Sequence, residues 1–176
     1  MTPVSTPSQS FSFSIDLPIR SEWANVDLLR TSVQNCFTAV FSDIDGCQAL
    51  AMVTGELLEN AVKYGDWHGQ PGGTFRLRVW GEGTRSAGGR NAHVSVESPV
   101  AADDPNVAAL LGTLDWIATF PTTKDAYRAK LLQIAEAPGD LIESRLGLVR
   151  CAYEGNCVLK AEVKGGTLRV TADSTF

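Results

Sequence analysis

Three polar side chains near the middle of the chain have types and a spacing that suit phosphate chemistry. Glu56, Asn60 and Lys63 stand at positions i, i+4 and i+7 of a segment with helical periodicity. At 100° per residue they share an arc of about 60° on the helix surface. An asparagine oxygen can coordinate Mg²⁺, a glutamate can orient a water or a hydroxyl, and a lysine can neutralise phosphate charge. A metal–phosphate site is therefore one interpretation of this helix.

The apolar residues of the same segment place that polar arc at the border between core and solvent. They recur at three- and four-residue steps and form a stripe beside the arc, made of Val53, Leu57, Ala61 and Tyr64. The other interpretation is an ordinary amphipathic helix, with Glu56 as a surface charge and an interior polar side chain at position 60. Spacing alone does not decide between the two interpretations.

The rest of the chain supplies the elements that must position this helix. Alternation of apolar and polar residues predicts strands at about 11–17, 75–79, 92–96, 158–163 and 168–172. Longer periods predict helices at about 21–40, 47–64, 104–117, 121–137 and 145–153. The order β-α-α-β-β-α-α-α-β-β indicates an α+β fold, which we expect to be a two-layer α/β sandwich with a mixed sheet and helices on one face.

Local signals predict the breaks between these elements. Pro18 either closes the first strand or puts it at a sheet edge. Ser21 is the expected cap of the first helix, and 42–46 and 81–91 are expected turns. Gly165 and Gly166 predict a tight hairpin turn, since both can adopt positive φ. We expect residues 1–10 to be a disordered tail and residues 11–176 to form a single domain.

Composition excludes several classes of function. The chain has 176 residues, 15 Lys plus Arg against 20 Asp plus Glu, and a net charge of −5. This acidic balance argues against a nucleic-acid binder, and no apolar run is long enough to cross a membrane. The cysteines lack C-x-x-C spacing, so we expect reduced, mostly buried thiols in a cytoplasmic protein; they are Cys36, Cys47, Cys151 and Cys157.

Two segments resemble motifs of a known superfamily. The run from Glu56 to Gly65, ELLENAVKYG, is similar to the N-box of the histidine-kinase-like (GHKL) ATPases, above all to its form in the anti-sigma-factor serine kinases. Leu146 to Val149, LGLV, resembles the second glycine box of these proteins. The element order and the length look most like the Sia-type kinases of bacterial partner switching. The resemblance covers about residues 11–173.

The resemblance implies an ATP site between the N-box helix and the sheet. Glu56 would match the residue that polarises the attacking hydroxyl, and Asn60 would match the Mg²⁺ ligand. Lys63 and Tyr64 would lie near the phosphates or the lid. Gly147 would approach the phosphates at a helix N-terminus, where free N–H groups favour anions.

Two departures from the family pattern concern the nucleotide. The D-x-G-x-G box, whose Asp reads adenine, is missing; Glu97 is the nearest acid, and Pro99 stands where a flexible glycine is expected. Arg145 also replaces a glycine of the second box. The Arg145 guanidinium would either bind the γ-phosphate or fill the pocket and exclude ATP.

These observations predict a bacterial regulator that binds ATP and Mg²⁺ and phosphorylates a serine or threonine of a small antagonist-like partner protein, or sequesters that partner. The alternative is a non-catalytic interaction module whose nucleotide site is closed. The sequence leaves open whether the protein forms a homodimer.

Overall fold

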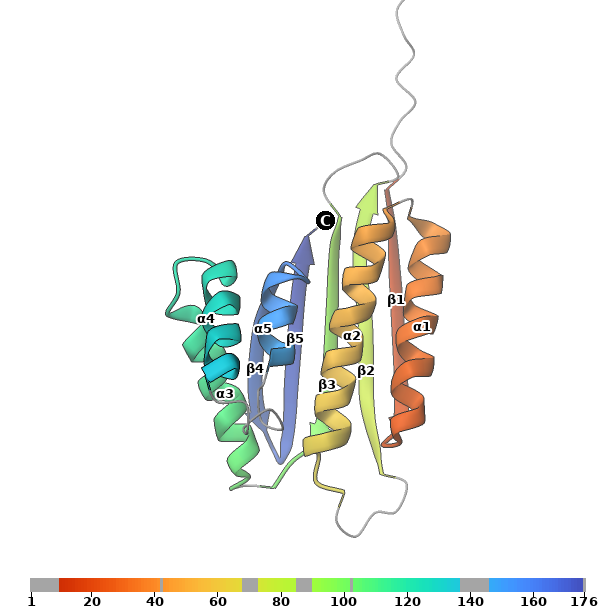
Figure 1. The fold of residues 1–176 in the computed structure, drawn as a ribbon. Coiled ribbons are helices and arrows are strands. Elements are labelled where there is room, and N and C mark those ends of the chain that lie inside the picture. The colour runs from red at the N-terminus through yellow and green to blue at the C-terminus, as the bar shows by residue number, and fades with distance from the viewer. Residues whose placement is uncertain are drawn as a thin grey trace, which may run out of the picture.

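The strands and helices follow one another in the predicted order (Figure 1). The structure is a computed structural model that describes residues 10–41, 43–67, 73–84, 90–101, 103–136 and 146–175. Its elements are β1 (Ser10–Arg20), α1 (Trp23–Val40), α2 (Ile44–Tyr64), β2 (Thr74–Thr84), β3 (Asn91–Pro99), α3 (Pro105–Ala118), α4 (Thr123–Glu136), α5 (Leu146–Tyr153), β4 (Cys157–Lys164) and β5 (Thr167–Thr175). The α+β class is confirmed. The predicted tail lies outside the described residues except for Ser10, which begins β1.

The sheet is antiparallel throughout, so the predicted mixed sheet is wrong in this respect. Its order is β1-β2-β3-β5-β4, and each of the four neighbouring pairs is antiparallel. Figure 1 shows the reason for β1 and β2: along the chain, β1 is followed by two helices, α1 and α2, which run in opposite directions before β2 begins. Two consecutive helices return the chain to the end at which β1 finished, so β2 starts there and runs in the opposite direction.

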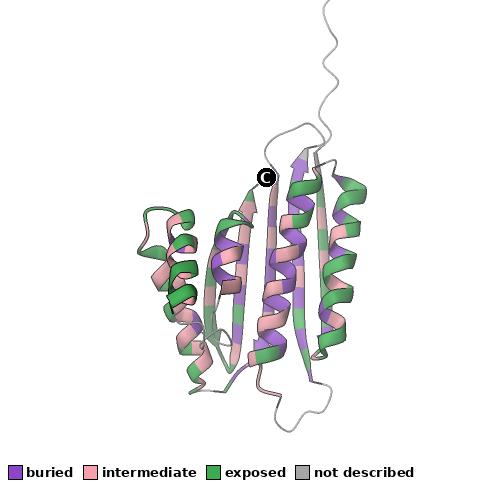
Figure 2. Ribbon diagram, in the orientation of Figure 1, coloured by how far each residue is buried: buried purple, intermediate pink, exposed green. Residues whose placement is uncertain are grey.

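The helices cover one face of this sheet, which confirms the two-layer sandwich. Figure 1 shows α2 in the middle of the helical layer with α1 on one side and α5 on the other. α2 packs against both α1 and α5 and against β3, and its buried residues occupy most of its length (Figure 2). α2 is therefore the central helix of the fold, and its position fixes where its polar residues lie.

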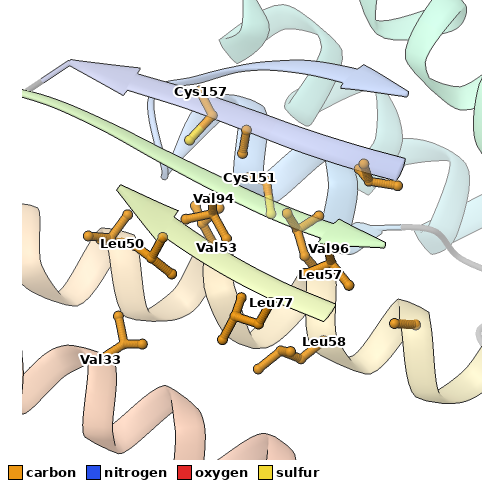
Figure 3. Close-up of a cluster of buried hydrophobic side chains, with 14 of the residues drawn as sticks. Val33, Leu50, Val53, Leu57, Leu58, Leu77, Val94, Val96, Cys151 and Cys157 are labelled. Carbon is orange, nitrogen blue, oxygen red and sulfur yellow. The ribbon is translucent and has the colours of Figure 1, made fainter. Parts of the chain in front are cut away.

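The core lies between α2 and the sheet (Figure 3). Leu57 and Leu58 of α2 are 2% and 0% exposed, and they face strand residues that are equally buried, among them Leu77, Val79, Val94 and Val96. Cys47, Cys151 and Cys157 are buried free thiols, as predicted, whereas Cys36 is exposed. Burial raises the pKa of Cys157 to about 11, which keeps this thiol protonated.

Element boundaries differ from the sequence predictions at three places. The N-cap position of α1 is Glu22 rather than Ser21, and the Glu22 side chain makes no capping hydrogen bond. α2 already begins at Ile44, within the predicted turn. β2 continues through Gly81, which is buried and pairs with Ala92 of β3. A Cβ at position 81 would overlap a backbone oxygen and an aromatic ring, so this glycine permits close strand packing instead of forming a turn.

Two other local predictions are confirmed. β1 continues past Pro18 to Arg20, and β1 is an edge strand, where a missing N–H is tolerated. Gly165 and Gly166 connect β4 to β5 with φ values of 57° and 74°. Both angles are in the left-handed region that a two-residue hairpin of this type requires.

The uncovered face of the sheet carries two rows of paired polar side chains. In the first row, Asp16 of β1 binds Arg76 of β2 with two contacts of 2.7 Å, and Arg169 of β5 bridges Glu97 of β3 at 2.9 Å and Glu162 of β4 at 2.7 Å. These contacts link neighbouring strands across the sheet.

The second row lies beside the first. The rings of Trp80 and His93 stack with centroids 5.1 Å apart. Asp173 accepts contacts of 2.7 Å from His93 Nδ1 and from Lys160 Nζ.

In the described part of the chain, no helix combines the length and apolar character that a membrane span requires.

Candidate functional site

A cavity of about 190 Å³ lies beside the C-terminal half of α2. Its walls come from α2 and from the first residues of α1, α3 and α5. The predicted site residues that line it are Glu56, Asn60, Lys63, Tyr64 and Gly147; the other lining residues are Trp23, Glu59, Asn106, Leu110, Leu146 and Leu148. The structure thus brings together α2, which carries the segment that resembles an N-box, and the start of α5, which resembles a second glycine box; the two are far apart in the sequence.

Three helices begin at the wall of this cavity. Trp23 is the first residue of α1, Asn106 the second of α3 and Leu146 the first of α5. The first N–H groups of a helix have no partner within the helix, and the helix dipole places partial positive charge at this end. The start of α3 is already occupied, because Pro105 has no N–H and the Asn106 N–H donates to Asp104 Oδ1 at 2.8 Å. The starts of α1 and α5 favour an anion in the cavity, although two carboxylates, Glu56 and Glu59, also line it.

Glu56 is held on both sides by α5. Its Oε1 accepts a hydrogen bond from Arg150 Nη1 at 2.9 Å, and its Oε2 lies so close to Gly147 that a Cβ at that position would overlap it. The Glu56 side chain is 20% exposed. Burial raises the pKa of its carboxyl, and the Arg150 guanidinium opposes part of that rise. Glu56 is therefore a fixed carboxylate whose pKa is shifted toward the range that suits a general base.

Asn60 lies between the cavity and a smaller apolar crevice. The crevice has a volume of about 20 Å³ and lies between α2, α3 and the sheet. Val107 and Leu110 of α3 line it together with Val96 of β3 and Val170 of β5. Asn60 and Tyr64 line both spaces, so these two residues stand at the passage between a polar and an apolar compartment.

Lys63 and Tyr64 end α2 at the same cavity. The Lys63 Nζ atom lies 4.8 Å from the centroid of the Tyr64 ring, a distance at which a cation and an aromatic ring attract each other. Both side chains line the cavity. A cation thus lies at the edge of the space that Asn60 and Glu56 border. Arg145 lies outside the described residues.

Glu97 is not brought to this cavity. Along β3, Val94, Val96 and Ser98 face the helices and are buried, whereas Glu97 points to the uncovered face and binds Arg169 there. Alternate residues of a strand point to opposite faces, so the correction follows from the pleat. The β3 residue next to the site is Ser98, which lines the apolar crevice. Pro99 lines neither the cavity nor the crevice.

Sequence reasoning missed two residues at this site. Arg150 of α5 contacts Glu56 of α2, and Trp23, which is 56% exposed, lies at the cavity wall. The only sequence signal for Arg150 is its spacing from Gly147, because residues three apart lie on one face of a helix. Trp23 had no signal, since the helix packing alone brings the start of α1 to α2.

The described residues contain no group of three or more His, Cys, Asp or Glu side chains that could hold a metal ion by themselves. The side-chain oxygen atoms at the cavity belong to Asn60, Glu59, Glu56, Tyr64 and Asn106, and Glu56 is already bound to Arg150. Mg²⁺ usually takes one or two protein oxygens and completes its shell with water and substrate phosphates. The donor set therefore fits a Mg²⁺ ion that arrives with a phosphate ligand.

The comparison with solved structures supports the fold. No family model matches the sequence, and no curated protein matches it. Among solved structures, the chain is similar to one in the crystal structure of the SiaB–SiaC complex from Pseudomonas aeruginosa, with a TM-score of 0.61 and 15% sequence identity. The match covers 92% of this chain and 89% of that chain. At this identity the likeness establishes a shared fold.

Proposed function

We propose that this protein is a partner-switching regulator that binds ATP and Mg²⁺ beside α2 and phosphorylates a serine or threonine of a small partner protein. One observation carries the proposal. Glu56 and Asn60, one helical turn apart, line a cavity with Lys63 and with Gly147, the second residue of α5. A carboxylate, an amide oxygen, a cation and a close-approaching backbone are the groups that phosphoryl transfer requires.

Each of these residues has a role in the proposed reaction. Glu56 accepts a hydrogen bond from the attacking hydroxyl and orients it. Asn60 offers its side-chain oxygen to Mg²⁺, and Lys63 offsets phosphate charge. Mg²⁺, when bound with ATP, supplies charge neutralisation between the phosphates. The α5 start, at Gly147, presents backbone N–H groups that would bind phosphate oxygens.

The size of the cavity limits how the nucleotide enters. Ligand pockets usually have volumes of about 300–1,000 Å³, whereas this cavity has about 190 Å³ and the apolar crevice about 20 Å³. In this proposal the phosphates and the metal would occupy the polar cavity. The base would enter the crevice, which Val107 and Leu110 of α3 line and keep narrow. Nucleotide binding in this proposal therefore includes a displacement of α3 from the sheet.

The partner is inferred from the structural neighbour. That neighbour comes from a complex of two different proteins, SiaB and SiaC. A shared fold over 92% of this chain supports the proposal that this chain also acts by binding a second protein. The proposed partner is small and presents the hydroxyl that Glu56 orients.

A second candidate function is a non-catalytic interaction module with the same fold. It is favoured by two observations. α3 fills the crevice that the base would occupy, and Arg150 already binds the Glu56 carboxylate. In this alternative the site residues serve the packing of α2 against α5, and the protein acts by binding its partner alone.

The first experiment is a calorimetric titration with ATP and Mg²⁺ of the wild type, Asn60→Ala and Asn35→Ala. Asn35 is an exposed asparagine on α1 and serves as the matched control. The proposal expects binding in the wild type and the control and its loss in Asn60→Ala. At 100 times the Kd, ligand would also raise the free energy of unfolding by about 2.7 kcal/mol. Absence of heat at millimolar ATP in the wild type would overturn the kinase proposal.

Glu56→Ala separates the two candidate functions. The kinase proposal expects this variant to bind the partner and to lose its phosphorylation, measured with labelled ATP. The interaction module expects neither partner binding nor phosphate incorporation to change.

A further inference from the structure

We propose that Arg150 is the positioning residue of this site and that α4 sets its position through Tyr127 and Glu154. Arg150 holds the Glu56 carboxylate in the ionised, fixed state that the proposed reaction requires. Its role in phosphoryl transfer rests on the proposed function. Its effect on Glu56 does not, and it can be measured without ATP.

The first step is the geometry of α5 around Glu56. Gly147 and Arg150 are three residues apart and therefore lie on one face of α5. Gly147 packs against Oε2 of Glu56, and Arg150 Nη1 donates to Oε1 at 2.9 Å. One turn of α5 thus contacts both oxygens of a single carboxylate. A guanidinium and a close backbone together restrict this carboxylate to one orientation.

The second step is the group that holds Arg150 itself. Arg150 Nε donates to Glu154 Oε2 at 3.2 Å, and the same Glu154 raises the pKa of the Tyr127 hydroxyl, so the two side chains lie close together. Tyr127 also packs against Tyr153, with ring centroids 5.1 Å apart. The planar guanidinium therefore bridges an acid of α2 and the acid that directly follows α5, and a residue of α4 lies beside that second acid.

The third step concerns the charges around Glu56. Glu59 on α2 and Glu154, directly after α5, raise its pKa, whereas Arg150 on α5 and Arg30 on α1 lower it. Arg30 is bound to Asp27 at 2.6 Å, and Arg150 makes the direct contact with Glu56. Removal of the Arg150 charge would therefore leave burial and two acids acting on Glu56, opposed only by the weaker effect of Arg30.

The consequence is a link between α4 and the proposed reaction. A protein or nucleotide that displaces α4 would pull Tyr127 from Glu154 and loosen Arg150. Glu56 would then lose its fixed orientation and hold its proton to higher pH. The contacts that form this link are the Arg150 hydrogen bonds to Glu56 and Glu154 and the ring contact between Tyr127 and Tyr153, with Tyr127 close to Glu154.

The test is an NMR titration of the Glu56 side-chain carboxyl carbon in protein labelled with ¹³C glutamate. The variants are Arg150→Gln, Arg150→Lys and Tyr127→Phe, and the matched control is Arg169→Gln, which breaks ion pairs of similar length on the uncovered face. We expect the Glu56 midpoint to rise by about one pH unit or more in Arg150→Gln, less in Arg150→Lys and Tyr127→Phe, and not in the control.

An unchanged Glu56 midpoint in Arg150→Gln would overturn the inference. If Arg150→Gln does not fold, Arg150→Lys decides, because it keeps the charge but cannot bridge Glu56 and Glu154 with a planar group. A wild-type midpoint in that variant would then overturn the inference. Tyr127→Phe tests the link to α4: an unchanged midpoint would overturn that part.

The outcome is separable from the fate of the proposed function. If the protein binds no ATP, the titration still shows whether Arg150 controls Glu56. If ATP binds and a partner is phosphorylated, the pH profile of the rate should move to higher pH in Arg150→Gln by the same shift as the Glu56 midpoint. A profile that stays in place while the midpoint moves would overturn the positioning role in catalysis.

Discussion

The two faces of the sheet are built from the same strands, yet they hold their acidic residues in opposite ways. On the helix side, Glu56 is partly buried next to the core, and burial raises its pKa despite the contact with Arg150. On the uncovered side, burial also raises the pKa of Asp173, but hydrogen bonds from His93 and Lys160 outweigh it and lower the pKa.

The comparison teaches where stability and chemistry reside. Ion pairs on the uncovered face have exposed basic partners. They neutralise the charge of each acid but change the free energy of unfolding only slightly. The helix side has a dry core and one acid whose charge is only partly compensated. Proteins keep such an acid at a functional site although it does not stabilise the fold.

The largest expected effect is in the core of the helix side. Leu58→Ala should lower the free energy of unfolding by about 2–5 kcal/mol, because Leu58 is 0% exposed and its loss leaves a cavity under α2. Urea unfolding followed by circular dichroism measures the change. Leu132→Ala is the control: Leu132 is 64% exposed, so a change of about 0.5 kcal/mol or less is expected. Equal losses in both variants would contradict the assigned core.

The next effect is at the contact between α5 and Glu56. Gly147→Ala should destabilise the protein by about 1–3 kcal/mol, because the new methyl group overlaps the Glu56 carboxylate. Glu56→Ala in the same chain should restore most of the loss. The control is Gly112→Ala in α3, where a Cβ meets nothing within 4 Å. That change should stabilise α3 by up to about 1 kcal/mol. If the effects of Glu56→Ala and Gly147→Ala on the free energy of unfolding simply add in the double variant, the two residues do not touch.

A smaller effect is expected on the uncovered face. Asp173→Asn should lower the free energy of unfolding at pH 7 by less than about 1 kcal/mol. The folded-state pKa of Asp173 lies below its unfolded value, so the ionised form stabilises the protein above about pH 3.9. This stabilisation is lost as the pH falls through the folded-state pKa. The wild type and Asp173→Asn should therefore converge in acid, as measured by thermal unfolding from pH 7 to pH 2.

The smallest effect has the opposite sign. The folded-state pKa of Glu56 lies above its unfolded value, so the fold favours the protonated form, and ionisation removes that preference as the pH rises. Glu56→Gln should therefore raise the melting temperature slightly at pH 7, with no gain below about pH 4.3. A lower melting temperature of Glu56→Gln at pH 7 would contradict the comparison between the two faces, since Glu56 would then behave like Asp173.

The sequence alone predicted the elements and much of the site. Period-2 and helical patterns are local properties of the chain, which is why the strands and helices were placed correctly, with boundary errors at Ser21, Ile44 and Gly81. The hydrophobic stripe of α2 also fixed which of its faces is polar, so the positions of Glu56 and Asn60 at the edge of the core followed from residue types and spacing.

Other features required the tertiary structure. Strand direction depends on how many helices separate two strands and where they pack, so the antiparallel sheet was not evident from local patterns. Glu97 was chosen by its place in the sequence, but the pleat turns its side chain to the uncovered face. The pairing of Arg150 with Glu56 joins residues 94 positions apart, and no local pattern encodes such a contact. The sequence by itself therefore determined the elements and their polar faces, because both depend on near neighbours; the partners of the polar side chains were decided only by the packing of α5 against α2.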